Sequence, residues 1–293
     1  MSTSMQAKTS TSTPSEAVSP IVETLRRHLQ TLDALQAAAI RSARMWRRVS
    51  DSDAPVPGLA WTAAETAAHV IGDVRDYTEV LTRYARGYLT HADRPPESPA
   101  RVSAEVNARH LIDVPERNLH RLATQLEEAV AQYVAVARTV ALGRAVLTPN
   151  GLALDPSTMT GLLLGEQLIH SWDIARATDR IWSINTDDAL LVLPAVLTAA
   201  PCYLRPSRSH RRASFELRMR GGGRYRFAVQ HGCATVSAAG EPADCVITAD
   251  PVTFLLLGFG RIRQWSPVLS GKLRPGGRMP WRAMRFASLL STP

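Results

Sequence analysis

The spacing of apolar residues changes once along this chain of 293 residues, near residue 204. Over residues 20–204, apolar side chains recur every three or four positions, which is the period of amphipathic helices. Farther on, they alternate with polar residues in four short segments, as in strands that bury one face; the segments are residues 215–219, 225–229, 234–238 and 245–249. The chain is therefore predicted to fold as α + (α+β), a helical bundle followed by a small α+β domain with an antiparallel sheet.

The same change of pattern suggests the domain boundaries. Residues 1–19 are rich in Ser and Thr, without an apolar core or a cleavage pattern, so they are predicted to be a disordered tail and not a signal peptide. Residues 20–204 form the predicted bundle, 205–213 a polar, basic linker, and 214–293 the α+β domain. Each of the two folded parts is long enough to bury a core of its own.

Composition favours a cytoplasmic protein. The content of 45% hydrophobic and 20% charged residues is that of an ordinary globular chain, and no apolar run reaches the roughly 18 residues of a membrane span. The three cysteines form no CxxC pair, which fits a reducing compartment in which Cys202, Cys233 and Cys245 are small buried thiols. We expect no membrane span, and a monomer or a weak homodimer.

Local signals place several helix ends. Thr62 and Glu65 have the spacing of a capping box, which starts one helix. Ser157 or Thr158 is the predicted N-cap of a later helix that ends near residue 178.

Three further features concern helix packing and interruption. Pro115 is predicted to break a helical stretch over residues 103–142. Gly161 and Gly165, four positions apart, predict a close approach of another helix. Residues 280–290 are predicted to form a last amphipathic helix.

One helix face carries an unusual set of ionisable residues. At 100° per residue, Glu166, His170 and Asp173 share a face that is otherwise apolar. An unpaired carboxylate there would cost several kcal/mol, so it needs a partner. Two interpretations remain open: a buried Glu–His ion pair that only steers packing, or a divalent cation bound by Glu166 and His170. The second interpretation requires a third ligand elsewhere in the chain.

His69 is the candidate for that third ligand. It lies about two turns into the helix that begins after Thr62, with Asp73 one turn farther on the same face. A lone histidine in such a place is usually a core or surface residue, so its position alone decides nothing. The remaining histidines have no ligand spacing and are interpreted as surface or structural residues: His28, His91, His110, His120, His210 and His231.

The positive charge of the chain is concentrated in its second part. The net charge is +8, and the segment from Arg205 to the end contains 14 Arg and one Lys against four acidic residues. Such a segment could suit nucleic acid, a membrane surface or an anionic small molecule. The basic residues are almost all Arg, which suggests a coding bias, and no helix-turn-helix, zinc-finger or aromatic RNA-binding motif is present. We therefore expect no nucleic-acid partner.

Taken together, these residues resemble the mycothiol-dependent maleylpyruvate isomerase family. The similarity rests on a histidine early in the second helix after a Trp-Thr entry, on the later Glu-x-x-x-His-x-x-Asp-hydrophobic-Ala-Arg helix, and on an α+β tail. In that family the bundle is DinB-like and metal-binding, and the C-terminal domain is similar to sterol-carrier-protein folds. The resemblance covers nearly the whole chain after the tail.

The resemblance implies site residues. The family's metal triad carries over to His69, Glu166 and His170, and its acidic residue one turn after the second histidine carries over to Asp173. Asp173 is the predicted catalytic residue: it could bind substrate, orient a metal-bound water or support His170. The family also uses an arginine of the C-terminal domain, for which six residues compete here, namely Arg218, Arg220, Arg224, Arg226, Arg261 and Arg263.

Two imidazoles and one carboxylate leave coordination positions open, as at a catalytic zinc. Together with this ligand set, the resemblance implies a metal-dependent enzyme, with zinc or another divalent ion. It would activate the thiol of mycothiol toward a small electrophilic substrate, by S-transfer or cis–trans isomerisation. Two alternatives remain. One is a lipid- or small-molecule-binding protein with a metal-stabilised bundle, and the other is a metal-assisted hydrolase or isomerase that needs no thiol.

Overall fold

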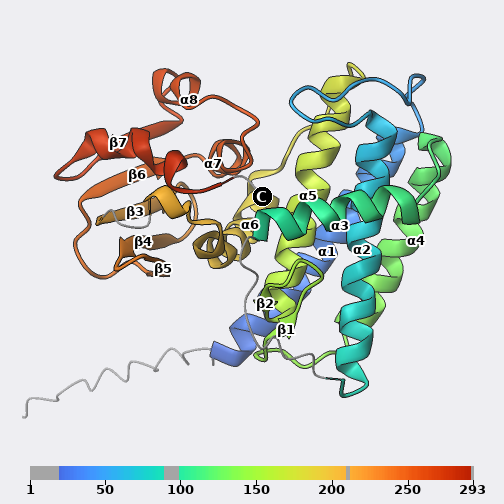
Figure 1. Ribbon diagram of the computed structural model, residues 1–293, viewed down its shortest axis with the longest axis horizontal. Helices are drawn as coiled ribbons and strands as arrows, with labels where there is room; N and C mark the ends of the chain where they lie inside the picture. The colour runs from blue at the N-terminus through green and yellow to red at the C-terminus, as the bar shows by residue number, and fades with distance from the viewer. Residues whose placement is uncertain (1–19, 89–98, 209–211, 292–293) are drawn as a thin grey trace, which may run out of the picture.

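The computed structural model describes residues 20–88, 99–208 and 212–291. The predicted tail over residues 1–19 and the middle of the predicted linker lie outside the described residues. A helical bundle and a smaller part built on a sheet lie side by side (Figure 1). The predicted combination of an all-helical part and an α+β part is therefore confirmed.

Four helices make the bundle, and a fifth packs against it. The bundle helices are α1 (Pro20–Trp46), α2 (Ala63–Ala85), α4 (Leu119–Ala137) and α5 (Pro156–Ala177), and α3 (Pro99–Asp113) lies against α2. A short hairpin of β1 (Val146–Leu147) and β2 (Ala153–Leu154) precedes α5. The predicted break at Pro115 is confirmed, since α3 ends before this residue and α4 begins after it.

Capping explains where α2 and α5 begin. The predicted capping box is confirmed: the Thr62 hydroxyl accepts the backbone N–H of Glu65, and the Glu65 carboxylate accepts that of Thr62. The predicted N-cap of α5 at Ser157 or Thr158 is wrong. Asp155 caps this helix by accepting both of their backbone N–H groups, because a proline follows it in the first helical position, where it is favoured.

The sheet has five strands in the order β5-β4-β3-β6-β7. The strands are β3 (Ala213–Met219), β4 (Arg224–Gln230), β5 (Cys233–Ala238), β6 (Cys245–Ala249) and β7 (Leu273–Gly276). The predicted antiparallel sheet is confirmed in part: three of the four strand pairings are antiparallel, but β3 and β6 run parallel. The segment after β5 crosses the sheet, so that β6 begins beside the start of β3 and runs in the same direction. The sequence does not show this, because side chains alternate in the same way in parallel and antiparallel strands.

The helical segments of this second part are short. They are α7 (Pro251–Gly258), α8 (Trp265–Leu269) and α9 (Ala283–Phe286). The single helix predicted over residues 280–290 is wrong, since α9 is only the middle of three short turns, flanked by 3-10 turns on both sides. Its Phe286 packs in the core against Phe215, Phe227 and Phe254. The cysteine prediction is correct only for Cys245, because Cys202 and Cys233 are exposed.

Helix α6 (Thr186–Ala199) joins the two parts (Figure 1). Its Ala189 and Val192 belong to the bundle core, whereas its Leu193 and Leu197 belong to the core beneath the sheet. In the opposite direction, α7 inserts apolar side chains, including Leu255, into the bundle core. The boundary predicted near residue 204 thus follows a helix whose two faces serve different cores.

The predicted close approach at Gly161 and Gly165 is confirmed, and α6 is the neighbour. A Cβ atom at Gly161 would lie 2.6 Å from the Cβ of Ala195, and one at Gly165 would lie 3.0 Å from Val192. We expect Gly161→Ala to destabilise the protein by about 1–3 kcal/mol, the usual cost of overpacking a core. Denaturant unfolding measures this, with Gly240→Ala as the control because nothing lies within 4 Å of a Cβ there.

An additional substitution tests whether the close approach itself is the cause. Replacing Ala195 with glycine in the Gly161→Ala background removes the clashing Cβ and should restore part of the lost stability. If Gly161→Ala alone is as stable as the unchanged chain, α5 and α6 do not approach each other closely at Gly161.

Within the part of the chain that the structure describes, no helix is long and apolar enough to cross a membrane.

Candidate metal centre

A cavity of about 550 Å³ lies where the bundle meets the α+β part. Its walls are mainly apolar, with contributions from α5, α6, α7 and the C-terminal turns. The three predicted metal ligands, His69, Glu166 and His170, line the bundle side of this cavity, and Arg261 lines it from the other part. A volume of this size is within the range of small-ligand sites.

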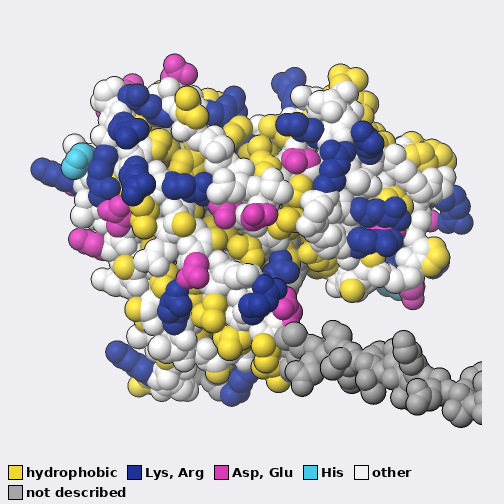
Figure 2. Space-filling model, turned by 180° about the vertical axis from the view of Figure 1, so that it is seen from behind, with side chains coloured by type: hydrophobic (Ala, Val, Ile, Leu, Met, Phe, Trp, Pro, Cys, Tyr) yellow, Lys and Arg dark blue, Asp and Glu magenta, His cyan; other side chains and the backbone are white. Residues whose placement is uncertain are grey.

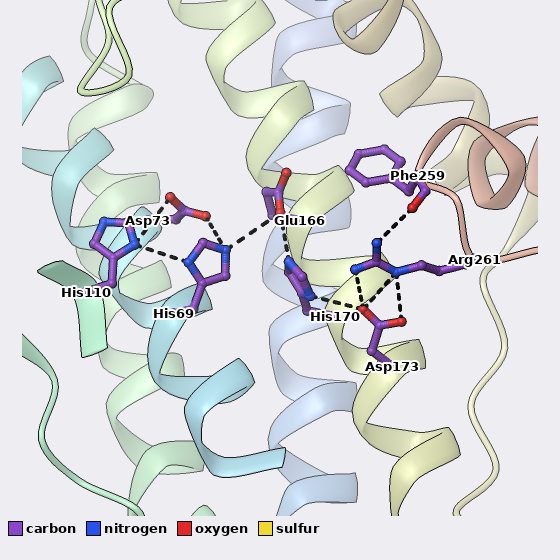
Figure 3. Close-up of polar contacts among 8 residues, drawn as sticks. All are labelled: His69, Asp73, His110, Glu166, His170, Asp173, Phe259 and Arg261. Atoms are coloured by element: carbon purple, nitrogen blue, oxygen red, sulfur yellow. Dashed lines mark hydrogen bonds and ion pairs between the residues drawn. The ribbon is translucent and has the colours of Figure 1, made fainter. Parts of the chain in front are cut away.

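The structure brings the three predicted ligands together. His69 comes from α2, and Glu166 and His170 come from successive turns of α5 (Figure 3). The Glu166 Oε2 atom lies 3.1 Å from His170 Nε2 and 3.9 Å from His69 Nε2. Ligand atoms bound to one zinc ion at about 2.0–2.2 Å lie no more than about 4.4 Å apart. The donor types and these distances therefore fit a divalent cation.

Burial and hydrogen bonding set the charges of these ligands. Burial alone would raise the pKa of Glu166, but hydrogen bonds with His170 and His69 outweigh it and hold the pKa well below its usual range. Burial lowers the pKa of His170, but hydrogen bonds with Asp173 and Glu166 outweigh it and raise the pKa to about 9. A cation would have to displace the His170 proton, because a ligating imidazole is neutral.

Asp173 lies behind His170, away from the cavity wall. Its Oδ2 atom is 3.1 Å from His170 Nδ1, and its side chain is only 1% exposed. Burial raises the pKa of Asp173, but hydrogen bonds with His170 and Arg261 outweigh it and lower the pKa. Of the three roles left open by the sequence, this position is suited to supporting His170, since the carboxylate already has two partners and does not line the cavity.

Among the six competing arginines, Arg261 is the one that lines the cavity. Its Nε lies 3.0 Å from Asp173 Oδ1 and its Nη2 2.7 Å from Asp173 Oδ2 (Figure 3). The turn that follows the C-terminus of α7 positions Arg261. In this turn Gly260 adopts a φ of +71°, and the backbone N–H of Arg261 donates to the carbonyl of Leu256 at 2.8 Å. The guanidinium also donates to the carbonyl of Phe259 at 2.7 Å. A bidentate ion pair therefore connects the α+β part to the candidate metal centre.

Sequence reasoning missed one residue of this site, His110, and placed Asp73 on the His69 face without giving it a role. His110 was expected to be a surface or structural residue, yet it is only 1% exposed and its Nδ1 lies 3.2 Å from His69 Nδ1. Asp73 Oδ2 lies 3.2 Å from His69 Nε2. A glycine inside a helix, Gly72, was the available signal, because a Cβ there would lie 2.4 Å from the His110 ring.

The described residues thus contain two groups that could hold a metal, and His69 belongs to both. One is His69, Glu166 and His170, and the other is His69, Asp73 and His110; within each group the ligand atoms all lie within 4.8 Å of one another.

On the face of the molecule seen in Figure 2, basic side chains are spread over both parts among acidic, apolar and uncharged ones.

Comparison with known proteins gives similarity at the level of fold. No protein-family model matches the sequence, and no curated protein matches it. The crystal structure of a mycothiol-dependent maleylpyruvate isomerase is similar, with a TM-score of 0.55 and 16% identity over 86% of this chain and 92% of that chain. A mutant of that enzyme, with a histidine replaced by alanine, matches equally well at 15% identity. The chain therefore has a fold similar to that of this isomerase over most of both lengths.

Proposed function

We propose that this protein is a metal-dependent enzyme that uses mycothiol to act on a small electrophilic substrate, by cis–trans isomerisation or by S-transfer. The observation that supports it best is the convergence of two imidazole nitrogens and one carboxylate oxygen on a cavity of about 550 Å³. The fold shared with a mycothiol-dependent isomerase supports the choice of thiol.

His69, Glu166 and His170 would hold the divalent ion, for which zinc is the expected identity. Three protein ligands of this kind leave a position open for another molecule, as in catalytic zinc sites. A bound ion would lower the pKa of a coordinated thiol, so that its sulfur would be a nucleophilic thiolate at neutral pH.

The remaining residues orient and shield the site. Asp173 accepts the Nδ1 proton of His170, which leaves Nε2 directed at Glu166. Arg261 lines the cavity while its guanidinium is paired with Asp173, so the pair would hold Asp173 in place behind His170. Apolar residues such as Leu162, Leu257 and Phe259 line the rest of the cavity and keep water away from the reacting groups.

The first test is metal content. Mass spectrometry of protein purified without chelator should find about one equivalent of a divalent metal, and His69→Ala should lose it. His120→Ala is a matched control, because His120 is exposed on α4 and belongs to neither candidate metal-binding group. Metal-free native protein, or full metal content in His69→Ala, would contradict the proposed site.

Turnover then distinguishes the proposal from its alternatives. The metal-loaded protein should act on electrophiles, beginning with maleylpyruvate, only when mycothiol is added. Turnover without any thiol would favour a metal-assisted hydrolase or isomerase. Co-purified lipid in a protein without metal would favour the binding protein.

A further inference from the structure

The two ring nitrogens of His69 face different neighbours. Nε2 faces the cavity side, 3.2 Å from Asp73 Oδ2 and 3.9 Å from Glu166 Oε2, whereas Nδ1 lies 3.2 Å from His110 Nδ1 (Figure 3). The other nitrogen of His110, Nε2, lies 3.0 Å from Asp76 Oδ2. Asp76 is in turn paired with Arg109, which is about half exposed. A continuous row of hydrogen bonds thus runs from the cavity to the surface of α2 and α3.

The protons in this row have one consistent placement when His69 Nε2 binds an ion. A ligating nitrogen carries no proton, so the proton of a neutral His69 ring is on Nδ1 and is donated to His110 Nδ1. That nitrogen of His110 must then be unprotonated, and its proton is on Nε2, where Asp76 accepts it. Arg109 pairs with the Asp76 carboxylate at the surface end of the row.

We propose that His110 is a positioning residue of the metal centre: it accepts the Nδ1 proton of His69 and, through Asp76, fixes which nitrogen of His69 is free to bind the ion. This inference rests on the proposed metal site. It adds to that site a residue that touches neither the ion nor the cavity.

The packing around His110 supports this role. The ring is buried, and α2 has a glycine at the point of contact, since any Cβ at Gly72 would overlap the ring. The arrangement also matches that of the other histidine ligand. His170 uses Nδ1 to bond Asp173 and directs Nε2 toward Glu166, just as His69 uses Nδ1 to bond His110. Both proposed ligands therefore have an outer hydrogen-bond partner, as metal-bound histidines generally do: a carboxylate for His170 and an imidazole for His69.

A second ion is the competing explanation for the same residues. His69, Asp73 and His110 have the spacing of a metal site of their own. With an ion there, the two rings would bind metal and would not share a hydrogen bond. The number of ions bound by the unchanged protein separates the two cases.

The test is zinc affinity, measured by competition with a chelating dye. His110→Phe keeps a ring but offers no acceptor, and we expect it to bind zinc about 10–100-fold more weakly. His110→Gln keeps an acceptor oxygen and an N–H donor, so it should recover much of the affinity. The unchanged protein should bind one equivalent. Equal affinity in His110→Phe, or two equivalents of which one is lost in this variant, would overturn the proposal.

The outcomes also separate this inference from the proposed function. If the unchanged protein binds no zinc, both fail; if it binds zinc and His110→Phe binds it equally well, only the role of His110 fails. Thermal melting of the metal-free variants shows whether they fold. Should His110→Phe not fold, Asp76→Asn replaces it, because it removes the charge at the more exposed end of the row. A several-fold loss of affinity is then expected, and unchanged affinity would overturn the proposal.

Discussion

Glu166→Gln is expected to weaken zinc binding by more than about 100-fold and to abolish thiol-dependent turnover. Glu166 is the one anionic member of the proposed triad, and its Oε2 lies close to both histidine ligands. Losing a group that merely orients a ligand costs about 10–100-fold in affinity, and losing a ligand should cost more. Glutamine has the same size, so the effect reports charge and coordination and not a cavity.

Chelator competition and turnover with mycothiol measure this effect. Glu79→Gln is the control, since Glu79 is on α2 with a side chain 70% exposed and pairs with Arg83 at the surface. Zinc binding of native strength in Glu166→Gln would show that the ion lies elsewhere. The group of His69, Asp73 and His110 would then be the site to examine.

Arg261→Met is expected to lower the free energy of unfolding by about 3 kcal/mol. Removing one partner of a buried ion pair typically costs about 3–5 kcal/mol, because the other charge is left buried without compensation. The lower end applies because His170 still bonds to Asp173 after the change. Methionine retains most of the apolar stem, so the lost stability reports the guanidinium.

Denaturant unfolding measures this change, with Arg263→Met as the control. Arg263 lies two residues away and is exposed, so its loss should change stability by less than about 0.5 kcal/mol. A double-mutant cycle with Asp173→Asn isolates the pair itself. Additive losses in that cycle would show that Arg261 and Asp173 do not interact as described.

Two members of the proposed metal triad could be placed on one helix face because the information is local. Glu166 and His170 are one helical turn apart, so their common face follows from the helical period alone. Placing His69 beside them needed more, namely the resemblance to a family, since no periodicity relates α2 to α5. The capping box at Thr62 was predictable for the same local reason, because both of its hydrogen bonds lie within four residues.

What was missed depends on contacts between distant segments. His110 meets His69 only because α3 lies across α2, and nothing in the short α3 sequence specifies that docking. Arg261 could not be chosen among six arginines, because the turn after α7 that aims it at Asp173 is a tertiary feature. The parallel pairing of β3 and β6 escaped prediction because alternation of side chains is the same in both strand directions.

Helices α6 and α7 each bury side chains in the core of the other part, so the two parts of this protein are not expected to fold independently. A fragment ending near residue 204 would leave Leu193 and Leu197 without the sheet that covers them. A fragment beginning near residue 214 would carry Leu255 and Phe259 without the bundle that receives them. Each fragment would expose an apolar surface that is buried in the whole chain and would therefore tend to aggregate. Neither part could be fused to another protein unless the helix that covers this surface were included.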